Sequence, residues 1–322
     1  MHNFKKIILP IAGACLLFVF ITGILNYALI PYSYVKIMMH QVTTENFDTV
    51  FLGTSHGISG INPKVLDAKT GEKNINLCMG GEYPLDAYYF LKQVCEKHIP
   101  KRVVYELDYG YWCTPKGQKG DFNRIFYEMP FSIAKLEYFA AKTMKTDFRA
   151  TVFPWFYYRS QYRNIKGIIG TKNSDVYKNL GTAPFQGPHQ AYEDGFIKIK
   201  EVPGEKAAAG LILWDEKNLQ EEAVKYFEKM VKFCRRKGIE FTVITTPIPR
   251  EALAQNQEVF QKADEYFKQY LKQQQVPYIN YNNPDKMIKN FDYSLNIFSD
   301  YEGHMTENQA EALSNQLVED IF

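Results

Sequence analysis

Two short segments that lie far apart in the sequence carry side chains that could perform acyl chemistry together. Near the N-terminal end, Gly53-Thr54-Ser55 places a serine in a glycine turn. Near the C-terminal end, Asp300 and His304 place an acid and a base on one loop. A serine hydroxyl is a weak nucleophile until a base removes its proton, and an acid on the far side of the imidazole orients that base. The pattern predicts Ser55 as nucleophile, His304 as base and Asp300 as acid.

Neighbouring residues compete for these roles, and each segment also has an ordinary structural interpretation. His56 directly follows Ser55, so its side chain should diverge from the serine, which makes His304 the better base. Glu302 stays open as an alternative to Asp300. A serine after a glycine turn is often only a helix cap, and an acid and a histidine on a loop often only solvate a helix start. The order and placement of the two segments together carry the catalytic prediction.

The motifs around these residues resemble those of SGNH (GDSL-like) hydrolases, and more narrowly those of their membrane-anchored, DltD-like bacterial relatives. In that superfamily the nucleophile lies after the first strand in a G-D-S turn, which Ser55 and the two residues before it resemble. A second block has an asparagine and, five residues later, an oxyanion glycine, as Asn76 and Gly81 do. The resemblance implies that the backbone N–H groups of Ser55 and Gly81 bind the oxyanion.

The two remaining family blocks fit less well. The last block is D-x-x-H, whereas three residues rather than two separate Asp300 from His304. The third block, G-x-N-D, is not recognisable, and its place holds Asp108, which cannot donate a hydrogen bond when ionised. The resemblance covers roughly residues 46–112 and 238–322.

The N-terminal segment is predicted to be an uncleaved transmembrane signal-anchor. Residues 7–30 form an uncharged, mostly apolar run, and about 20 apolar residues span a bilayer as a helix. Lys5 and Lys6, in a tail of residues 1–6, place the N-terminus in the cytoplasm and the rest of the chain outside it. A cleaved signal peptide is the alternative, but the run is longer than a usual signal core and no small-x-small site follows. A reversed topology, with the enzyme facing the cytoplasm, is a further alternative.

Strands alternate with helices along much of the chain, which predicts a parallel sheet covered on both faces. Five short runs are the expected strands: Thr49–Leu52, Lys73–Leu77, Arg102–Leu107, Glu240–Thr246 and Val276–Tyr281. The expected helices are one starting at Asn62-Pro63 and others over Tyr83–His98, Glu216–Lys237, Glu258–Gln275 and Thr306–Phe322. The predicted fold class is α/β, a three-layer α/β/α sandwich with about five parallel strands, similar to SGNH and flavodoxin-like folds.

One domain with an insertion is expected after the membrane segment. Residues 31–47 are predicted to be a juxtamembrane stalk, and residues 48–322 the SGNH-like domain. About residues 110–210 break the strand–helix rhythm with aromatic-rich pieces and loop-like stretches. They are interpreted as a mixed helical and loop insertion that caps the active-site end of the sheet.

The carboxyl ends of parallel strands meet at one edge of a sheet, and ligands bind outside that edge. Ser55, Gly80, Asp108 and Arg250 each follow a predicted strand, and His304 could join them from its loop. This convergence predicts a site independently of motif matching. The expected lining residues are Gly80, Asn76, His56, Asp108 and Arg250.

Charge, cysteine and histidine content favour no other function class. With 38 basic and 36 acidic residues the formal charge is +2, which gives no argument for nucleic-acid binding. The five cysteines show neither a disulfide framework nor metal-ligand spacing. The other histidines also lack partners at metal spacing, so neither a metal nor a cofactor is expected; they are His2, His40, His98 and His189.

The primary prediction is an extracytoplasmic, membrane-tethered serine esterase or O-acyltransferase that works through an acyl-Ser55 intermediate. The resemblance implies a cell-envelope substrate, an acylated glycopolymer such as teichoic acid or polysaccharide, or a lipid-linked form of it. It also implies a membrane acyltransferase of the MBOAT type as partner, beside lipid contact through the N-terminal helix. The alternative is a non-catalytic cell-envelope assembly or binding protein on a degenerate SGNH fold, favoured by the offset acid and the missing third-block asparagine.

Overall fold

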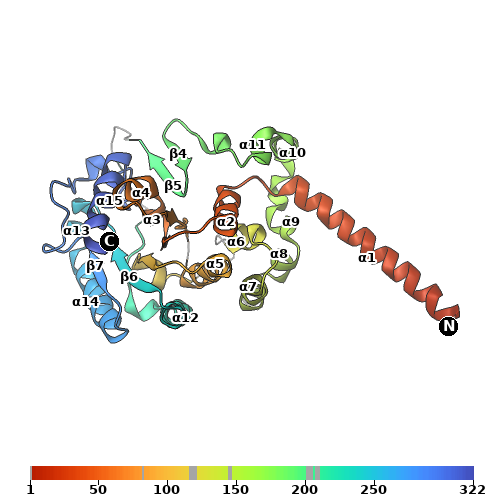
Figure 1. Cartoon of the computed structure of the whole chain (residues 1–322), viewed down its shortest axis with the longest axis horizontal. Helices are drawn as coiled ribbons and strands as arrows, with labels where there is room; N and C mark the ends of the chain where they lie inside the picture. The colour runs from red at the N-terminus through yellow and green to blue at the C-terminus, as the bar shows by residue number, and fades with distance from the viewer. Residues whose placement is uncertain (1, 82, 116–121, 144–146, 201–205, 207–210) are drawn as a thin grey trace.

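The computed structural model describes residues 2–81, 83–115, 122–143, 147–200, 206 and 211–322. At its centre is a parallel sheet of five strands in the order β2-β1-β3-β6-β7 (Figure 1). The strands are β1 (Thr49–Leu52), β2 (Asn74–Asn76), β3 (Arg102–Glu106), β6 (Glu240–Thr245) and β7 (Tyr278–Asn280). With β6 and β7 counted as fourth and fifth, this is the doubly wound order 2-1-3-4-5. The predicted α/β fold class is confirmed.

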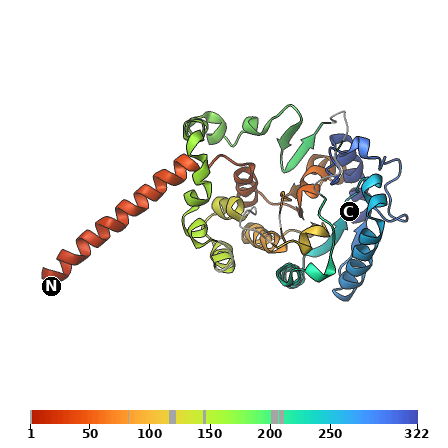
Figure 2. The same ribbon diagram turned by 180° about the vertical axis from the view of Figure 1, so that it is seen from behind.

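Helices cover both faces of the sheet, because each connection between parallel strands must cross over it. One face carries α3 (Ser55–Gly60), α4 (Pro63–Thr70) and α15 (Glu307–Ile321). The opposite face carries α5 (Pro84–Lys97), α12 (Glu221–Lys237) and α14 (Gln257–Gln273), as Figures 1 and 2 show. All four residues of β1 are buried between these layers, which explains why this strand has no polar face.

The chain begins with one long helix, α1 (His2–Leu29), that projects from the rest of the molecule (Figure 1). Its segment Pro10–Leu29 is long and apolar enough to cross a membrane. The next helix is α2 (Tyr34–Thr44), capped by Ser33 Oγ, which accepts a hydrogen bond from Val35 N. Residues of the expected stalk therefore form a helix whose apolar side chains are buried and which packs against α5.

The insertion divides into two parts with different neighbours. The helices of the first part are α6 (Phe122–Glu128), α7 (Ile133–Thr143), α8 (Phe148–Val152), α9 (Pro154–Tyr157), η2 (Tyr158–Asn164), α10 (Ile165–Asn173) and α11 (Asp175–Lys178). Of these short helices, α9, η2 and α10 contact α1 whereas α6 and α7 pack against α5 (Figure 1). The second part contains a hairpin of β4 (Gln190–Glu193) and β5 (Phe196–Ile199) that packs beside α3.

Short helices also occur elsewhere in the described chain, inside and outside the insertion. They are η1 (Gly110–Cys113), η3 (Ala183–Phe185), η4 (Glu216–Asn218), α13 (Arg250–Gln255) and η5 (Leu295–Ile297).

Candidate active site

The serine lies in a turn that a buried carboxylate holds in place. Gly53 adopts φ +148°, and a Cβ at this position would lie 2.6 Å from Glu106 Cβ, so only glycine fits here without displacement. Glu106 Oε2 accepts hydrogen bonds from Thr54 N at 2.7 Å and from Thr54 Oγ1 at 2.8 Å. Thr54 Oγ1 in turn accepts from His56 N at 3.3 Å and caps α3. Ser55, half-buried, is therefore fixed as the first residue of α3 at the carboxyl end of β1.

Glu106 was not singled out by the sequence analysis as a site residue, although it ends the third strand of the sheet. Burial raises its pKa to about 7, and the nearby Asp108 carboxyl adds to the shift, which the bonds from Thr54 oppose. The sequence contains one signal, an acid that directly follows the run Val103-Val104-Tyr105. Such an acid is expected to have a specific partner, because an isolated buried carboxylate is costly.

Asn76 was expected to line the site, and the structure gives it another task. Its side chain is fully buried, and Nδ2 donates to the carbonyl oxygens of Gly57 at 2.9 Å and Ile61 at 2.8 Å. Its Oδ1 accepts from Cys78 N at 3.0 Å. Asn76 thus binds the backbone at the end of α3 and holds the serine helix against β2, instead of facing a ligand.

Two glycines follow β2, and the first of them, Gly80, lies beside the serine. A Cβ on Gly80 would lie 3.8 Å from Ser55 Cβ, which is ordinary contact distance. Gly81 has φ +74°, so the turn uses the left-handed conformation that favours glycine. The two glycines leave the backbone exposed next to Ser55, where an acyl group could approach it.

The acid and the base lie on one loop before α15, and the structure pairs Asp300 with His304. Asp300 Oδ2 is 2.6 Å from His304 Nδ1, while Asp300 Oδ1 accepts from the backbone N–H groups of Gly303 at 3.0 Å and His304 at 3.2 Å. Gly303 has φ +110°, and a Cβ there would lie 3.3 Å from Pro249 Cδ. The additional residue between acid and base is therefore accommodated by a glycine turn that returns the imidazole to its carboxylate. Glu302 does not take this place.

Asp300 and His304 shift each other's pKa so that each side chain favours its charged form. Burial alone would lower the pKa of His304, but the hydrogen bond and charge of Asp300, with smaller contributions from Glu302 and Asp108, raise it above 6.5. Burial likewise opposes ionisation of Asp300, but its bonds with His304 and Gly303 hold the pKa of the carboxyl well below its usual range. Asp300 is therefore a stable carboxylate that fixes the ring and leaves Nε2 of His304 for other chemistry.

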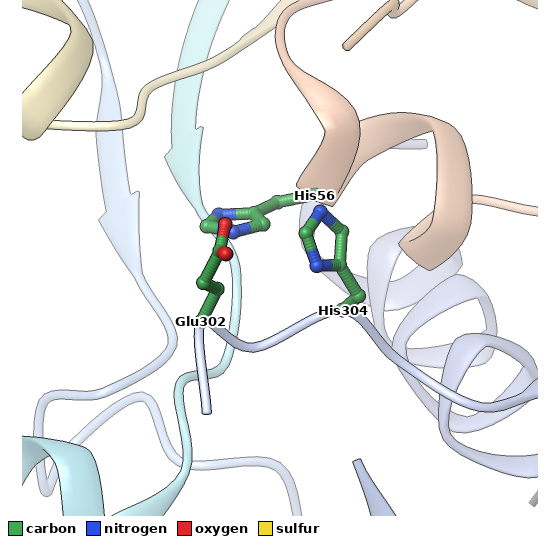
Figure 3. A group of neighbouring side chains, drawn as sticks. All are labelled: His56, Glu302 and His304. Atoms are coloured by element: carbon green, nitrogen blue, oxygen red, sulfur yellow. The ribbon is translucent and has the colours of Figure 1, made fainter. Parts of the chain in front are cut away.

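His56 lies next to this pair. Its ring is edge-on to His304, with 4.9 Å between ring centroids, and its Nδ1 is 3.6 Å from Asp108 Oδ2. Figure 3 shows the two imidazoles and the Glu302 carboxylate directed toward one another. Burial, with a smaller contribution from the neighbouring His304, lowers the pKa of His56 to about 3, so His56 is neutral at pH 7. The site contains two histidines of opposite electrostatic character.

A small cavity continues from His56 into the protein. It has a volume of about 30 Å³, which is room for about two water molecules. Asp108 lines it, and burial raises the pKa of this carboxyl to about 6 although Gly110 N donates to it. The apolar part of its wall includes Ile212, Trp214 and Phe260. Arg250 was also expected to line the site, but it is exposed at the start of α13 and is not part of this wall.

One group in the described part of the chain has the composition of a metal site. Ligand atoms of His56, Glu302 and His304 all lie within 4.8 Å of one another. Ligands bound to zinc at about 2.0–2.2 Å in a tetrahedron are about 3.4 Å apart. An ion held by these three side chains would take up the nitrogen of His304 that is otherwise free.

Ser55 and His304 come from elements that pack against each other. Helix α3 packs on α15, and a Cβ on Gly60 would lie 2.6 Å from Met305 Cε, directly after the histidine. Within the described residues, no hydrogen bond joins Ser55 Oγ to His304. The predicted nucleophile and base therefore lie on neighbouring elements without the direct hydrogen bond of an assembled triad. In enzymes without bound substrate, the catalytic hydrogen bonds are often long and shorten only when substrate binds.

No protein-family model matches the chain, and no curated protein matches it. Among solved structures, the chain is similar to a proposed acylhydrolase from Bacteroides fragilis, with 11% identity, 90% of this chain and 97% of that chain covered, and a TM-score of 0.42. It is also similar to a GDSL-like lipase from Bacteroides thetaiotaomicron, with 12% identity, 85% and 88% coverage, and a TM-score of 0.38. At these values neither similarity carries an argument about function, which rests on the geometry described above.

Proposed function

We propose that the protein is a membrane-tethered serine acyl enzyme in which Ser55 is the nucleophile, His304 the base and Asp300 its orienting acid. The observation that carries the proposal is the 2.6 Å contact between Asp300 Oδ2 and His304 Nδ1, on a loop packed against the serine helix. A carboxylate bound to Nδ1 fixes the tautomer in which Nε2 can accept a proton. Ser55, in a glycine turn at the same edge, is the group that such a base would activate.

The reaction divides into two proton-balanced half-reactions. Ser55 Oγ loses its proton to His304 Nε2 and forms a bond to the acyl carbon, and the donor alcohol leaves with that proton. An acceptor hydroxyl then loses its proton to His304 and attacks the acyl-serine, and Ser55 recovers a proton as its ester bond breaks. Water as acceptor gives an esterase, and a sugar or polyol hydroxyl gives an O-acyltransferase.

The negative charge that develops on the acyl oxygen needs donors. The backbone N–H groups of Ser55 and Gly81 are the proposed pair, supported by the contact of Gly80, the residue before Gly81, with Ser55. Asp108 occupies the position of the family's missing asparagine. It would donate a hydrogen bond only when protonated, and its raised pKa of about 6 makes that form accessible in mildly acidic conditions.

The N-terminal helix supports a location at the membrane. Segment Pro10–Leu29 has the length and composition of a bilayer span, and its side chains are almost all exposed in the isolated chain. Lys5 and Lys6 before it favour an extracytoplasmic domain. The resemblance to DltD-like proteins then makes a cell-envelope polymer the proposed substrate and an MBOAT-type membrane acyltransferase the proposed partner.

Covalent labelling with a fluorophosphonate probe tests the proposal on the full-length protein in detergent. We expect labelling of the wild type that is lost in Ser55→Ala and in His304→Ala. Ser160→Ala is the matched control, because this exposed serine lies outside the site and should leave labelling unchanged. Thermal unfolding of each variant confirms that the loss reflects chemistry and not unfolding.

A wild type that is folded and remains unlabelled, both alone and with small alkyl fluorophosphonates that enter a narrow site, contradicts the proposal. That result favours a non-catalytic cell-envelope assembly or binding protein. One observation favours this non-catalytic alternative: among the described residues, no hydrogen bond joins Ser55 Oγ to His304.

A further inference from the structure

The segment of the insertion around Phe153 and Trp155 contacts the C-terminal half of α1. The rings of Phe18 and Phe153 meet edge-on, with 5.5 Å between their centroids. Eight residues further along α1, Asn26 Oδ1 accepts a hydrogen bond from Trp155 N at 3.0 Å. Helices α9 and α10 also contact α1, and Figures 1 and 2 both show them beside its end. This part of the insertion therefore follows α1 for several turns.

The depth of these contacts is informative if α1 spans a bilayer. Phe18 precedes Leu29, the end of α1, by 29 − 18 = 11 residues, which is about 16 Å along a helix axis. Half of a hydrocarbon core about 30 Å thick is about 15 Å. Phe153 touches Phe18, so the segment around it cannot remain in the water above the membrane. It must enter the leaflet on the side of the folded domain.

The composition of this segment suits a lipid interface. Residues 148–173 contain five basic and no acidic residues, whereas the whole chain has 38 basic and 36 acidic. Seven aromatic residues fall within this segment: Phe148, Phe153, Trp155, Phe156, Tyr157, Tyr158 and Tyr162. Aromatic side chains concentrate at membrane–water interfaces, and cationic side chains are attracted to anionic headgroups.

The exposed side chains are of the same two kinds. Phe148 is 56% and Tyr162 is 58% exposed, which is unusual for large rings that face water. The guanidinium groups of Arg149 and Arg159 lie over the ring of Phe156, at 4.6 and 4.2 Å from its centroid. Arginine on an aromatic platform keeps its charge at the polar boundary while its stem covers apolar surface.

The backbone of the segment is also compatible with a lipid environment. Residues 148–173 are helical almost throughout, in α8, α9, η2 and α10. Helices this short leave end groups without intrahelical partners, and one of these groups, Trp155 N, donates to Asn26 Oδ1 on α1. A hollow of about 440 Å³ opens beside the end of α1, and its lining includes two cationic side chains, Lys135 and Lys172, and one carboxyl group, that of Glu128.

We propose that residues 148–173 form an interfacial element that lies in the domain-side leaflet beside α1 and binds anionic phospholipid. The aromatic side chains enter the acyl region, and the arginines and lysines meet the phosphate groups. This inference rests on the membrane attachment of the proposed function, but not on its chemistry.

Tryptophan fluorescence tests the inference, because the chain has three tryptophans in two environments. Trp112 and Trp214 are buried in the domain, 1% and 8% exposed, whereas Trp155 lies in the interfacial element. The full-length protein is reconstituted into vesicles of phosphatidylcholine and phosphatidylglycerol whose acyl chains carry bromine, a short-range quencher. Trp155→Phe is the matched control, since it removes only the reporter.

We expect the wild type to lose severalfold more emission to brominated lipid than Trp155→Phe does, and the difference to grow with the anionic lipid fraction. Equal quenching of the two proteins overturns the inference and indicates that water or another protein covers this face. Quenching of Trp155 that is independent of lipid charge overturns the anionic preference alone.

Flotation of the same vesicles separates the possible failures. Protein that floats with the vesicles but shows no Trp155 quenching retains its anchor and contradicts only the interfacial element. Protein that does not float contradicts membrane attachment itself. Fluorophosphonate labelling, measured on the same samples, reports on the serine chemistry independently of both outcomes.

Discussion

Two histidine–aspartate pairs lie side by side in this protein, and they differ in almost every physical respect. His304 Nδ1 is 2.6 Å from Asp300 on a surface loop, and the pKa of this histidine is raised. His56 Nδ1 is 3.6 Å from Asp108, and burial lowers the pKa of this histidine to about 3. The same two residue types therefore give a strong base in one place and a neutral ring in the other.

The difference teaches that proximity to the serine does not make a histidine its base. His56 is next to Ser55 in the chain, but its imidazole is desolvated and its distance of 3.6 Å from Asp108 is outside hydrogen-bond range. His304 comes from the other end of the chain with its carboxylate already bonded. A general base needs both a free nitrogen and a stabilised protonated form, and in this site only the distant histidine has both.

Removing each imidazole in turn tests the comparison most severely. We expect His304→Ala to lower the second-order rate constant of fluorophosphonate labelling by at least about 10⁴-fold, because the serine loses its base. His56→Ala should cost about 10–100-fold, the effect of disturbed positioning. Stopped-flow or gel-based labelling rates measure both, and a larger loss in His56→Ala reverses the assignment.

The two carboxylates provide the next comparison. Asp300→Asn should slow labelling about 10³–10⁴-fold, since an amide no longer selects the required tautomer or stabilises the imidazolium. Asp108→Asn should slow it about tenfold or less, because its distance from His56 is outside hydrogen-bond range. Equal losses in the two variants would show that the site works as one network of carboxylates.

The pH dependence of labelling sharpens the same contrast. Only neutral His304 can accept the serine proton, so the rate should rise with pH through a midpoint above 6.5, since Asp300, Glu302 and Asp108 raise this pKa. Neutral His56 should add no step near neutral pH. The raised pKa of His304 also contributes folding stability that is complete below pH 6.5 and is lost as pH rises through the midpoint. Asp300→Asn should lower the midpoint, and an unchanged midpoint contradicts the pairing.

The smallest effect is expected at Gly303, in the turn that brings His304 back to Asp300. Gly303→Ala places a side chain at φ +110° against Pro249 and should cost about 1–3 kcal/mol of unfolding free energy. Gly71→Ala is the control, because φ is +70° there and the space around it is open. Denaturant unfolding should show a loss in both, whereas labelling of folded protein should slow in Gly303→Ala alone.

Much of the sheet could be predicted because its strands are short apolar runs between clear helix signals. Thr49–Leu52 forms β1 with the predicted bounds, and the other strands are one to three residues shorter at their ends than expected. The rule that parallel strands end at one edge also predicts the neighbourhood of Ser55, Gly80 and Asp108. These outcomes depend on local pattern and topology, which a sequence contains.

The β4–β5 hairpin was missed although its signal is present. Asp194-Gly195 joins the two strands as a two-residue loop with φ +47° and +84°, the pattern typical of a tight hairpin. The many glycine, proline and asparagine residues around it obscured the alternation. A Cβ on Gly195 would lie 2.3 Å from the Asn76 carbonyl oxygen, so this hairpin packs directly on the end of β2.

Other parts of the site could not be predicted because tertiary contacts decide them. Helix α3 is rich in glycine and serine, which are poor helix formers, and the Thr54 cap and burial of its apolar side compensate. An asparagine such as Asn76 can bond equally well to a ligand or to backbone, and only the folded chain shows which. The role of Glu106 likewise depends on a turn that lies 52 residues away in sequence from its carboxylate.

The contacts at the end of α1 have a mechanical consequence. Lys172 Nζ donates to Tyr27 O at 2.7 Å, and Tyr27 Oη donates to Asn173 Oδ1 at 2.6 Å. These bonds fix the C-terminal end of α1 to α10, so α1 is not attached to the domain through a flexible linker alone. If α1 spans a bilayer as proposed, Ser55 would be held at a fixed height above it, and a protein attached in this way would meet new substrate by lateral diffusion. Under the proposed function, acceptor groups at other distances from the membrane would react only if the polymer itself moved to the level of Ser55.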